Sequence, residues 1–231
     1  MKNLIKLAIS IIVMLVAVYF IYDYYKDKTI TGSYQNITNI DSSSKFIADL
    51  KDEHKNNEIV MYLEIPDVVG IAIPQTDNNE YYLTHNIDKK EDKNGTPFLD
   101  YRNKSLNDKK LIVYGHNDAY KNLPFSRLLD YQKEDFYKEH SKVHLYYDGG
   151  KRVYRIFSYF TEKEDFDYVN IYGFNDITFY EHILKLKDKS FYDTGTKIDG
   201  ESKILVIQTS TFDDNYNGDT KYQIIAAIEE K

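Results

Sequence analysis

Cysteine and tryptophan are absent from the 231-residue chain, and proline occurs only four times. Without cysteine there can be no disulfide, no thiolate metal ligand and no cysteine nucleophile. The ten glycines form neither a GxxxxGKS/T nor a GxGxxG pattern, so the sequence shows no phosphate-binding loop. The formal net charge of −7, without basic clusters interleaved with aromatics, argues against nucleic acid as a partner.

Histidine is the remaining residue type that commonly binds metals, and its spacing does not favour a metal site. His140 and His144 lie four residues apart but lack supporting ligands in the sequence, and the other histidines are scattered. We therefore expect no metal and no cofactor.

The first 25 residues predict a signal anchor. Lys2 and Lys6 precede an almost wholly apolar stretch from Leu7 to Tyr22, which approaches the ~20 residues that cross a bilayer. Tyrosines at its end are typical of the outer interface of the bilayer, and the early lysines indicate a cytoplasmic N-terminus. We expect a single-pass protein of the cell membrane with the rest of the chain outside the cell. A cleaved signal peptide and a buried core helix are the alternatives, but no small-x-small cleavage site follows the stretch.

The rest of the chain divides into a polar connection and one globular domain. Residues 26–57 predict a stalk followed by a short amphipathic helix over residues 43–55, which packs on the domain. Residues 58–231 predict a domain without an internal repeat.

Short apolar or alternating segments in residues 58–231 predict a mainly β fold. Strands are expected at residues 60–66, 68–74, 95–101, 111–114, 142–147, 151–160, 203–209 and 221–229. Helices are expected at residues 123–131, 133–139 and 176–187. The turn Asp148-Gly149-Gly150 predicts a hairpin. Short strands at close spacing, with helices in the long connections, favour a closed or nearly closed β-barrel over a parallel α/β sheet.

Two of the predicted strands end in residues that can carry chemistry. The apolar run 204–208 is followed by Thr209 and Ser210, and the run 111–114 is followed by Gly115 and His116. A hydroxyl and an imidazole at the ends of two core strands can meet as a nucleophile and its base. Each also has an ordinary structural explanation, because histidines and serines commonly form hydrogen bonds where strands end. Lys221 would ordinarily be a solvated charge.

Five motifs follow one another between residue 58 and the C-terminus. They are Tyr62-Leu63-Glu64-Ile65-Pro66, Asn79-Glu80-Tyr81-Tyr82-Leu83, Phe98-Leu99-Asp100-Tyr101-Arg102, Tyr114-Gly115-His116-Asn117 and Phe191-Tyr192-Asp193-Thr194-Gly195. In that order and spacing, and with the N-terminal apolar segment, the chain resembles the class B sortases. These are membrane-anchored cysteine transpeptidases of Gram-positive bacteria.

The resemblance implies a sortase-like β-barrel, an extracellular catalytic domain and the sorting signal of a surface protein as substrate. It implies cleavage after the threonine of that signal and transfer of the acyl group to an amine of a cell-wall precursor. The family's histidine, cysteine and arginine fall on His116, Ser210 and Lys221. The resemblance also assigns Thr209, Tyr168 and Asn117 to substrate binding.

Two of these positions depart from the family pattern. A thiol can be held as a thiolate beside an imidazolium, whereas a serine hydroxyl needs His116 as a true general base. Arginine offers a planar fork to an oxyanion, whereas lysine is a point charge. The sequence leaves three hypotheses open: a transpeptidase that Ser210 makes weak or inactive, a degenerate sortase that binds a peptide or wall component without turnover, and a serine peptidase.

Overall fold

The computed structural model describes residues 6, 10–21, 40–117, 123–163, 167–171, 173–210 and 221–231. The chain divides into two units, Met1–Thr38 and Asn39–Lys231. In the first unit residues 10–21 are helical, and most of their large apolar side chains are exposed. Among the residues that the structure describes, no helix has the length and apolar character needed to cross a membrane. Part of the anchor predicted over residues 1–25 lies outside the described residues.

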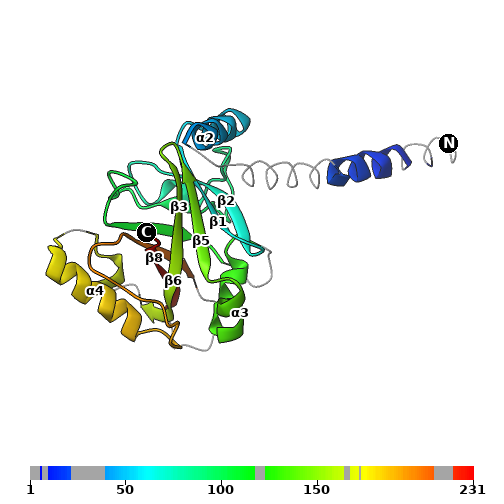
Figure 1. The fold of residues 1–231 in the computed structure, drawn as a ribbon. Coiled ribbons are helices and arrows are strands. Elements are labelled where there is room, and N and C mark those ends of the chain that lie inside the picture. The colour runs from blue at the N-terminus through cyan, green and yellow to red at the C-terminus, as the bar shows by residue number, and fades with distance from the viewer. Residues whose placement is uncertain are drawn as a thin grey trace. The chain divides into compact units, whose positions relative to one another are not determined.

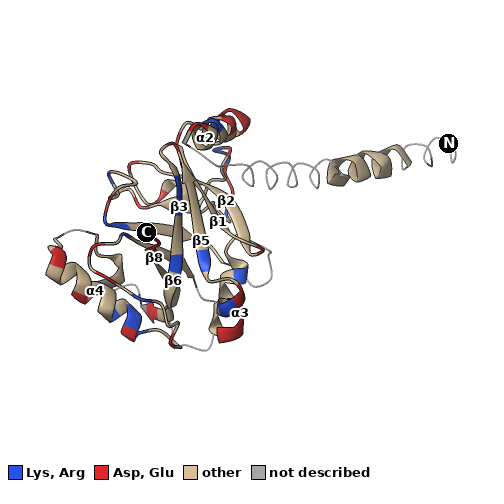
Figure 2. Ribbon diagram, viewed as in Figure 1, with Lys and Arg blue, Asp and Glu red and all other residues tan. Residues whose placement is uncertain are grey.

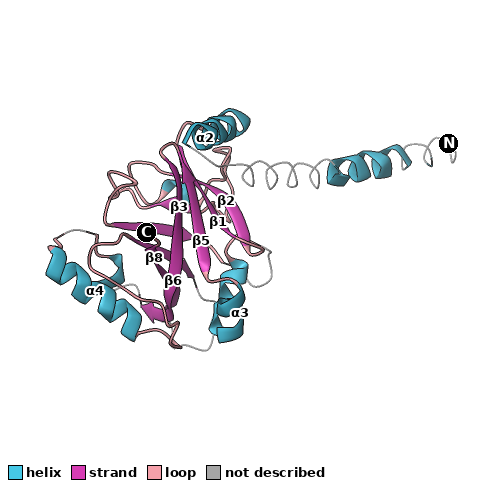
Figure 3. Ribbon diagram, viewed as in Figure 1, coloured by secondary structure: helices cyan, strands magenta, loops and turns pink. Residues whose placement is uncertain are grey.

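The second unit is built around one eight-stranded sheet with the strand order β2-β1-β5-β6-β8-β7-β4-β3 (Figures 1 and 3). The strands are β1 (Ile59–Ile65), β2 (Val69–Pro74), β3 (Phe98–Leu99), β4 (Lys110–Gly115), β5 (Lys142–Tyr147), β6 (Gly150–Lys163), β7 (Ile204–Ser210) and β8 (Lys221–Glu229). β4 and β7 pair in parallel, and the other described pairs are antiparallel. The predicted mainly β fold is confirmed.

The sheet curls into a nearly closed barrel, because its edge strands β2 and β3 come into contact. No ladder joins these two strands among the described residues, and a side chain bridges the seam instead. The amide of Gln75, just after β2, donates to the backbone carbonyls of Asp100 at 2.7 Å and Asn103 at 2.8 Å. Both amide hydrogens of Gln75 are therefore used to hold the two edges together.

Side chains alternate between the two faces of each strand, and each face builds its own apolar cluster. Leu111 and Val113 of β4 belong to the cluster inside the barrel, together with Leu205 and Ile207 of β7. Ile112, between the two β4 residues, belongs to a second cluster on the outer face, under α4 (Asp176–Asp188). The unbroken apolar runs predicted as buried strands are thus covered on both sides.

The remaining helices are α2 (Ile40–His54), α3 (Glu134–Glu139), η1 (Tyr81–Leu83), η2 (Ser126–Gln132) and η3 (Asp167–Val169). Acidic and basic residues are interspersed along α2, α3 and α4 (Figure 2). Phe46 of α2 packs edge-on against Tyr62 of β1, with ring centroids 5.2 Å apart. The hydroxyl of Ser43 lies 2.6 Å from the carbonyl of Tyr147 and 2.8 Å from that of Gly150. These contacts attach α2 to the barrel at the β5–β6 hairpin.

Two predicted elements differ from the observed ones. The strand expected over residues 95–101 contains only Phe98–Leu99, because the Asp100 carboxylate accepts the backbone N–H of Arg102 at 2.8 Å and turns the chain. The helix expected over residues 123–131 is observed as a 3₁₀ helix over Ser126–Gln132. It begins with i→i+3 hydrogen bonds such as Leu128 N–H to the Phe125 carbonyl.

Candidate active site

A cavity of about 400 Å³ opens where β4 and β7 end. Its polar lining includes Tyr114 and His116 from β4 and the residues after it, and Gln208 and Ser210 from β7. Its apolar lining comes from loops and short elements, namely Leu83, Phe98 and Val169. The cavity is therefore a partly apolar groove with a small number of polar groups, as binding sites commonly are.

The parallel pairing of β4 with β7 brings His116 and Ser210 to this cavity. Tyr114 pairs with Gln208 and Gly115 pairs with Thr209, so the next residue on each strand is His116 and Ser210 respectively. Paired strands lie about 4.8 Å apart, and residues at matching positions of parallel strands face the same side. The register of β4 and β7 therefore brings the imidazole of His116 and the hydroxyl of Ser210 to the same end of the sheet, as expected.

Gly115 is required between Tyr114 and His116 because the barrel interior is filled behind it. A Cβ added to Gly115 would lie 2.4 Å from the ring of Phe125 and 3.1 Å from Pro97. Glycine lets β4 approach these rings closely while it carries the flanking residues into the cavity.

The hydroxyl of Ser210 is bonded to the backbone and not to the imidazole. It donates to the carbonyl of Asn117 over a long 3.5 Å. The Nε2 atom of His116 is buried and has no hydrogen-bond partner within the described part of the chain. The nucleophile–base hydrogen bond on which a serine hydrolase depends is therefore not formed between these two groups.

The residue of β8 that pairs with Ser210 is Tyr222. Tyr222 also lines the cavity, and sequence reasoning did not single it out. Lys221, predicted at the arginine position, begins β8 and pairs through its backbone with Lys163. The side chain of Lys221 lies outside the described structure, so its predicted role stays a prediction.

The three residues predicted to bind substrate are buried around the cavity and are not among its lining residues. Thr209 and Asn117 are each 1% exposed, and their side-chain polar atoms have no partner among the described residues. The ring of Tyr168 is fully buried in the cluster under α4, while its neighbour Val169 lines the cavity. Substrate binding by Thr209, Asn117 and Tyr168 therefore stays a prediction.

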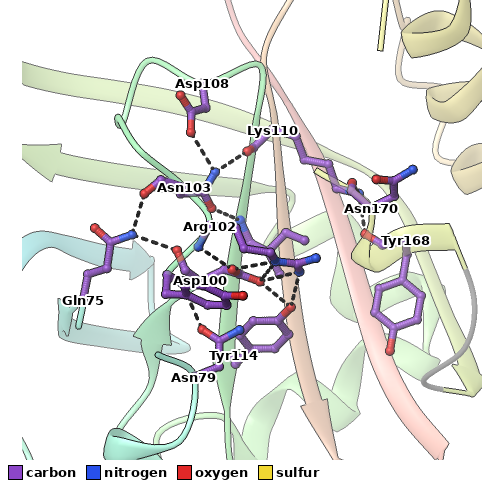
Figure 4. Close-up of polar contacts among 12 residues, drawn as sticks. Gln75, Asn79, Asp100, Arg102, Asn103, Asp108, Lys110, Tyr114, Tyr168 and Asn170 are labelled. Carbon is purple, nitrogen blue, oxygen red and sulfur yellow. Dashed lines mark hydrogen bonds and ion pairs between the residues drawn. The ribbon is translucent and has the colours of Figure 1, made fainter. Parts of the chain in front are cut away.

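An ionic network behind Tyr114 was not predicted as part of the site (Figure 4). The guanidinium of Arg102 donates three hydrogen bonds to the fully buried carboxylate of Asp100, the shortest 2.6 Å long. The hydroxyl of Tyr114 donates to the same carboxylate at 2.8 Å. The signal was present in the motif Phe98-Leu99-Asp100-Tyr101-Arg102, which places opposite charges two residues apart directly after a buried strand.

Burial and hydrogen bonding act in opposite directions on the pKa of Asp100. Burial alone would raise this pKa, but the bonds from Arg102 and Tyr114 hold it below its usual range. The pKa of Tyr114 is raised, first by burial and then by the charge of Asp100. Asp100 is thus a carboxylate and Tyr114 a neutral phenol, whose ring forms a fixed wall of the cavity.

Metal chemistry has no evident ligand set here, since the described residues contain no group of three or more His, Cys, Asp or Glu side chains that could hold an ion. The side chains at the cavity can act in acid–base and acyl chemistry, through the imidazole of His116 and the hydroxyls of Ser210 and Tyr222.

Comparison with known proteins identifies relatives over most of the chain. A scan against protein-family profiles found no match. The chain is 31% identical over 173 residues to Sortase B of Listeria monocytogenes, which covers 73% of this chain and 69% of that protein. A Staphylococcus aureus sortase B–substrate complex matches the fold with a TM-score of 0.75 and 22% identity, covering 88% of this chain and 91% of that one. A sortase B complexed with triglycine matches with a TM-score of 0.78 and 22% identity, covering 91% and 95%.

Proposed function

The chain belongs to the sortase B family, and from that premise we propose that it recognises the sorting-signal peptide of a surface protein in the cavity at the ends of β4 and β7. Ser210 stands at the nucleophile position and His116 at the base position. A solved sortase B binds a substrate and another binds triglycine, which supports a peptide and an amine as the two partners. The acceptor amine belongs to a cell-wall precursor.

Acyl transfer at this site follows from the groups in the cavity. The Ser210 oxygen attacks the carbonyl carbon of the threonine in the signal, and His116 accepts the hydroxyl proton. The peptide C–N bond breaks, and the departing amine takes that proton, which leaves the threonine as an ester of Ser210. The acceptor amine then attacks the ester and loses a proton to His116. The proton returns to the Ser210 oxygen, and a new amide has formed.

One observation argues that this transfer is weak or absent in the present form. The Ser210 hydroxyl donates to the Asn117 carbonyl, and Nε2 of His116 has no partner among the described residues. A serine hydroxyl is activated only when a base accepts its proton, whereas a thiol can ionise beside an imidazolium. The same observation favours a second candidate function, an anchored module that binds the sorting peptide or a wall component without turning it over.

Restoring the family's groups separates the two functions. The purified full chain is incubated with a set of labelled pentapeptides and with triglycine as the acceptor amine. Each pentapeptide contains the threonine followed by another residue, and the set varies at every position before the threonine. Ser210→Cys, Lys221→Arg and Tyr222→Arg are tested singly and as doubles with Ser210→Cys. Ser44→Cys, a serine-to-cysteine change on α2, is the matched control for thiol chemistry outside the cavity.

We expect peptide binding by the unmodified chain and cleavage only when Ser210→Cys is present. We expect a further gain of about a hundredfold from a guanidinium on β8. That gain should come from Tyr222→Arg if the residue paired with Ser210 faces the reacting carbonyl, and from Lys221→Arg otherwise. Turnover by the unmodified chain would exclude the binding module. Neither binding nor cleavage by any form would contradict the proposed function.

The place of the protein in the cell is proposed with the same function. The exposed apolar side chains along residues 10–21 support an N-terminal anchor that leaves the barrel outside the cell. Cell fractionation tests it: the full chain should sediment with membranes and be degraded by protease added to intact cells. Deletion of residues 1–38 should release it. Protection of the full chain from added protease would contradict the proposed orientation.

A further inference from the structure

Lys110, the first residue of β4, is a buried lysine whose ammonium group is fully engaged. Its side chain is 1% exposed. Its Nζ donates to the backbone carbonyls of Tyr168 and Asn170, the latter at 2.7 Å, and lies 2.9 Å from Nε2 of His182 on α4. An ammonium has three N–H donors, and each of these three groups can accept one of them. Figure 4 shows the lysine side chain reaching the segment that carries Tyr168 and Asn170.

The segment that Lys110 bonds forms one wall of the cavity. Val169 lies between the two bonded carbonyls and lines the cavity, whereas the ring of Tyr168 is buried in the cluster that includes Phe179 and Ile183. The carbonyl on each side of Val169 is thus fixed by the same ammonium. This arrangement leaves Val169 little freedom to shift toward or away from a bound peptide.

His182 completes the arrangement because it remains neutral. Burial, with the positive charges of Lys110 and Lys185, lowers the pKa of His182 to about 3. A neutral imidazole can accept a hydrogen bond from Lys110 at Nε2 while Nδ1 carries the ring hydrogen. A protonated imidazole carries a hydrogen on both nitrogens and could only donate. His182 is therefore an acceptor for Lys110 at neutral pH.

We propose that Lys110, supported by His182, is a positioning residue for peptide recognition, which fixes Val169 as a rigid wall of the cavity and so sets the peptide side chain accepted there. This inference rests on the proposed function, because it names how the same cavity selects its peptide. It assigns Lys110 no contact with the peptide. Its effect is transmitted through the two backbone carbonyls.

Two variants and a matched control test the proposal in the full chain. Lys110→Met removes the ammonium at similar length. Lys110→Met/His182→Leu removes the ammonium and the imidazole together, so that it leaves no unpaired imidazole of the kind that the single change creates. Lys109→Met is the control, because Lys109 also joins the start of β4 to α4, through an exposed ion pair with Asp176.

We expect both Lys110 variants to bind the preferred labelled pentapeptide about tenfold more weakly and to lose discrimination at one peptide position. In a Ser210→Cys background KM should rise while kcat is kept. Amide hydrogen exchange should quicken at residues 168–171 and stay unchanged in β4 and β7. Lys109→Met should leave all three measurements within about twofold of the starting protein.

A wrong inference about Lys110 can be distinguished from a wrong proposed function. If the double variant keeps its sheet protection and shows unchanged peptide affinity and unchanged exchange at residues 168–171, the proposal is wrong. If the starting protein binds none of the peptides, the proposed function fails. Hydrogen exchange at residues 168–171 then still decides whether Lys110 holds the segment.

Discussion

Single residues at the site are set by what surrounds them, and Asp100 is the clearest case. Its carboxylate is fully buried, yet it is held as an anion by the guanidinium of Arg102 and the hydroxyl of Tyr114. Removing one partner of a buried carboxylate lowers the stability of the fold, because the negative charge is then buried without compensation.

Arg102→Met should lower the free energy of unfolding by about 3 kcal/mol, because the charge of Asp100 then stays buried with only Tyr114 and backbone groups beside it. Tyr114→Phe should cost about 1 kcal/mol and leave peptide affinity nearly unchanged, since the hydroxyl is bonded to Asp100 and the ring remains. Urea denaturation measures both. Lys138→Met, which removes an exposed pair with Glu134, should change little. An equal loss in all three would argue that the Asp100 network is unimportant.

At the scale of elements, α2 shows where the folded unit begins within the polar residues 26–57. Phe46, Ile47 and Leu50 are all buried, and α2 belongs to the unit Asn39–Lys231. The expected amphipathic helix over residues 43–55 is observed as Ile40–His54. The helix packs on β1, β5 and β6, where Phe46 contacts the rings of Tyr62 and Tyr146.

Phe46→Ala should therefore destabilise the barrel unit by about 3–5 kcal/mol, through lost burial and the cavity that remains. Lys45→Ala, an exposed neighbour on the same helix, provides the comparison. Thermal unfolding followed by circular dichroism gives the difference between the two variants. A loss confined to helical signal, with the sheet unaffected, would mean that α2 is an accessory to the barrel and not part of its cooperative unit.

At the scale of the whole molecule, His182 links stability to pH. Its pKa is about 6.5 when unfolded and about 3 in the folded protein, where burial and then the charges of Lys110 and Lys185 lower it. Between these values the unfolded chain binds a proton that the folded chain does not. Its contribution to stability is therefore complete above about pH 6.5 and declines as the pH falls toward 3, by at most about 1.4 kcal/mol per pH unit.

His182→Gln should flatten this acid limb, because an amide oxygen can still accept from Lys110 but does not titrate. Urea unfolding at intervals between pH 3 and 7 provides the measurement. His85→Gln, at a partly buried histidine outside the cavity, should leave the slope intact. Equal slopes for the starting protein and His182→Gln would show that other groups govern the acid limb.

How far the sequence could predict this molecule depends on the range of the interactions involved. Strand and helix positions follow from local periodicity, so β7 and α4 were expected within a residue or two of where they lie. The position of Tyr222 opposite Ser210 depends on the register between β7 and β8. The loop that joins these two strands is outside the described residues, and local periodicity does not determine the register. The hydrogen-bond acceptors of Lys110 come from segments about 60 and 72 residues away in the chain. Local sequence patterns do not predict hydrogen bonds over such separations.

The pairing of β4 with β7 has a kinetic consequence. The Ser210 hydroxyl and the Asn117 carbonyl that accepts it are 93 residues apart in the chain. Parallel pairing over such a separation closes a large loop and forms slowly, whereas the β5–β6 hairpin is local and forms early. The cavity can exist only after β4 and β7 have met. A freshly synthesised chain should thus gain its peptide affinity as one of the last events in folding, well after most of its strand signal has appeared.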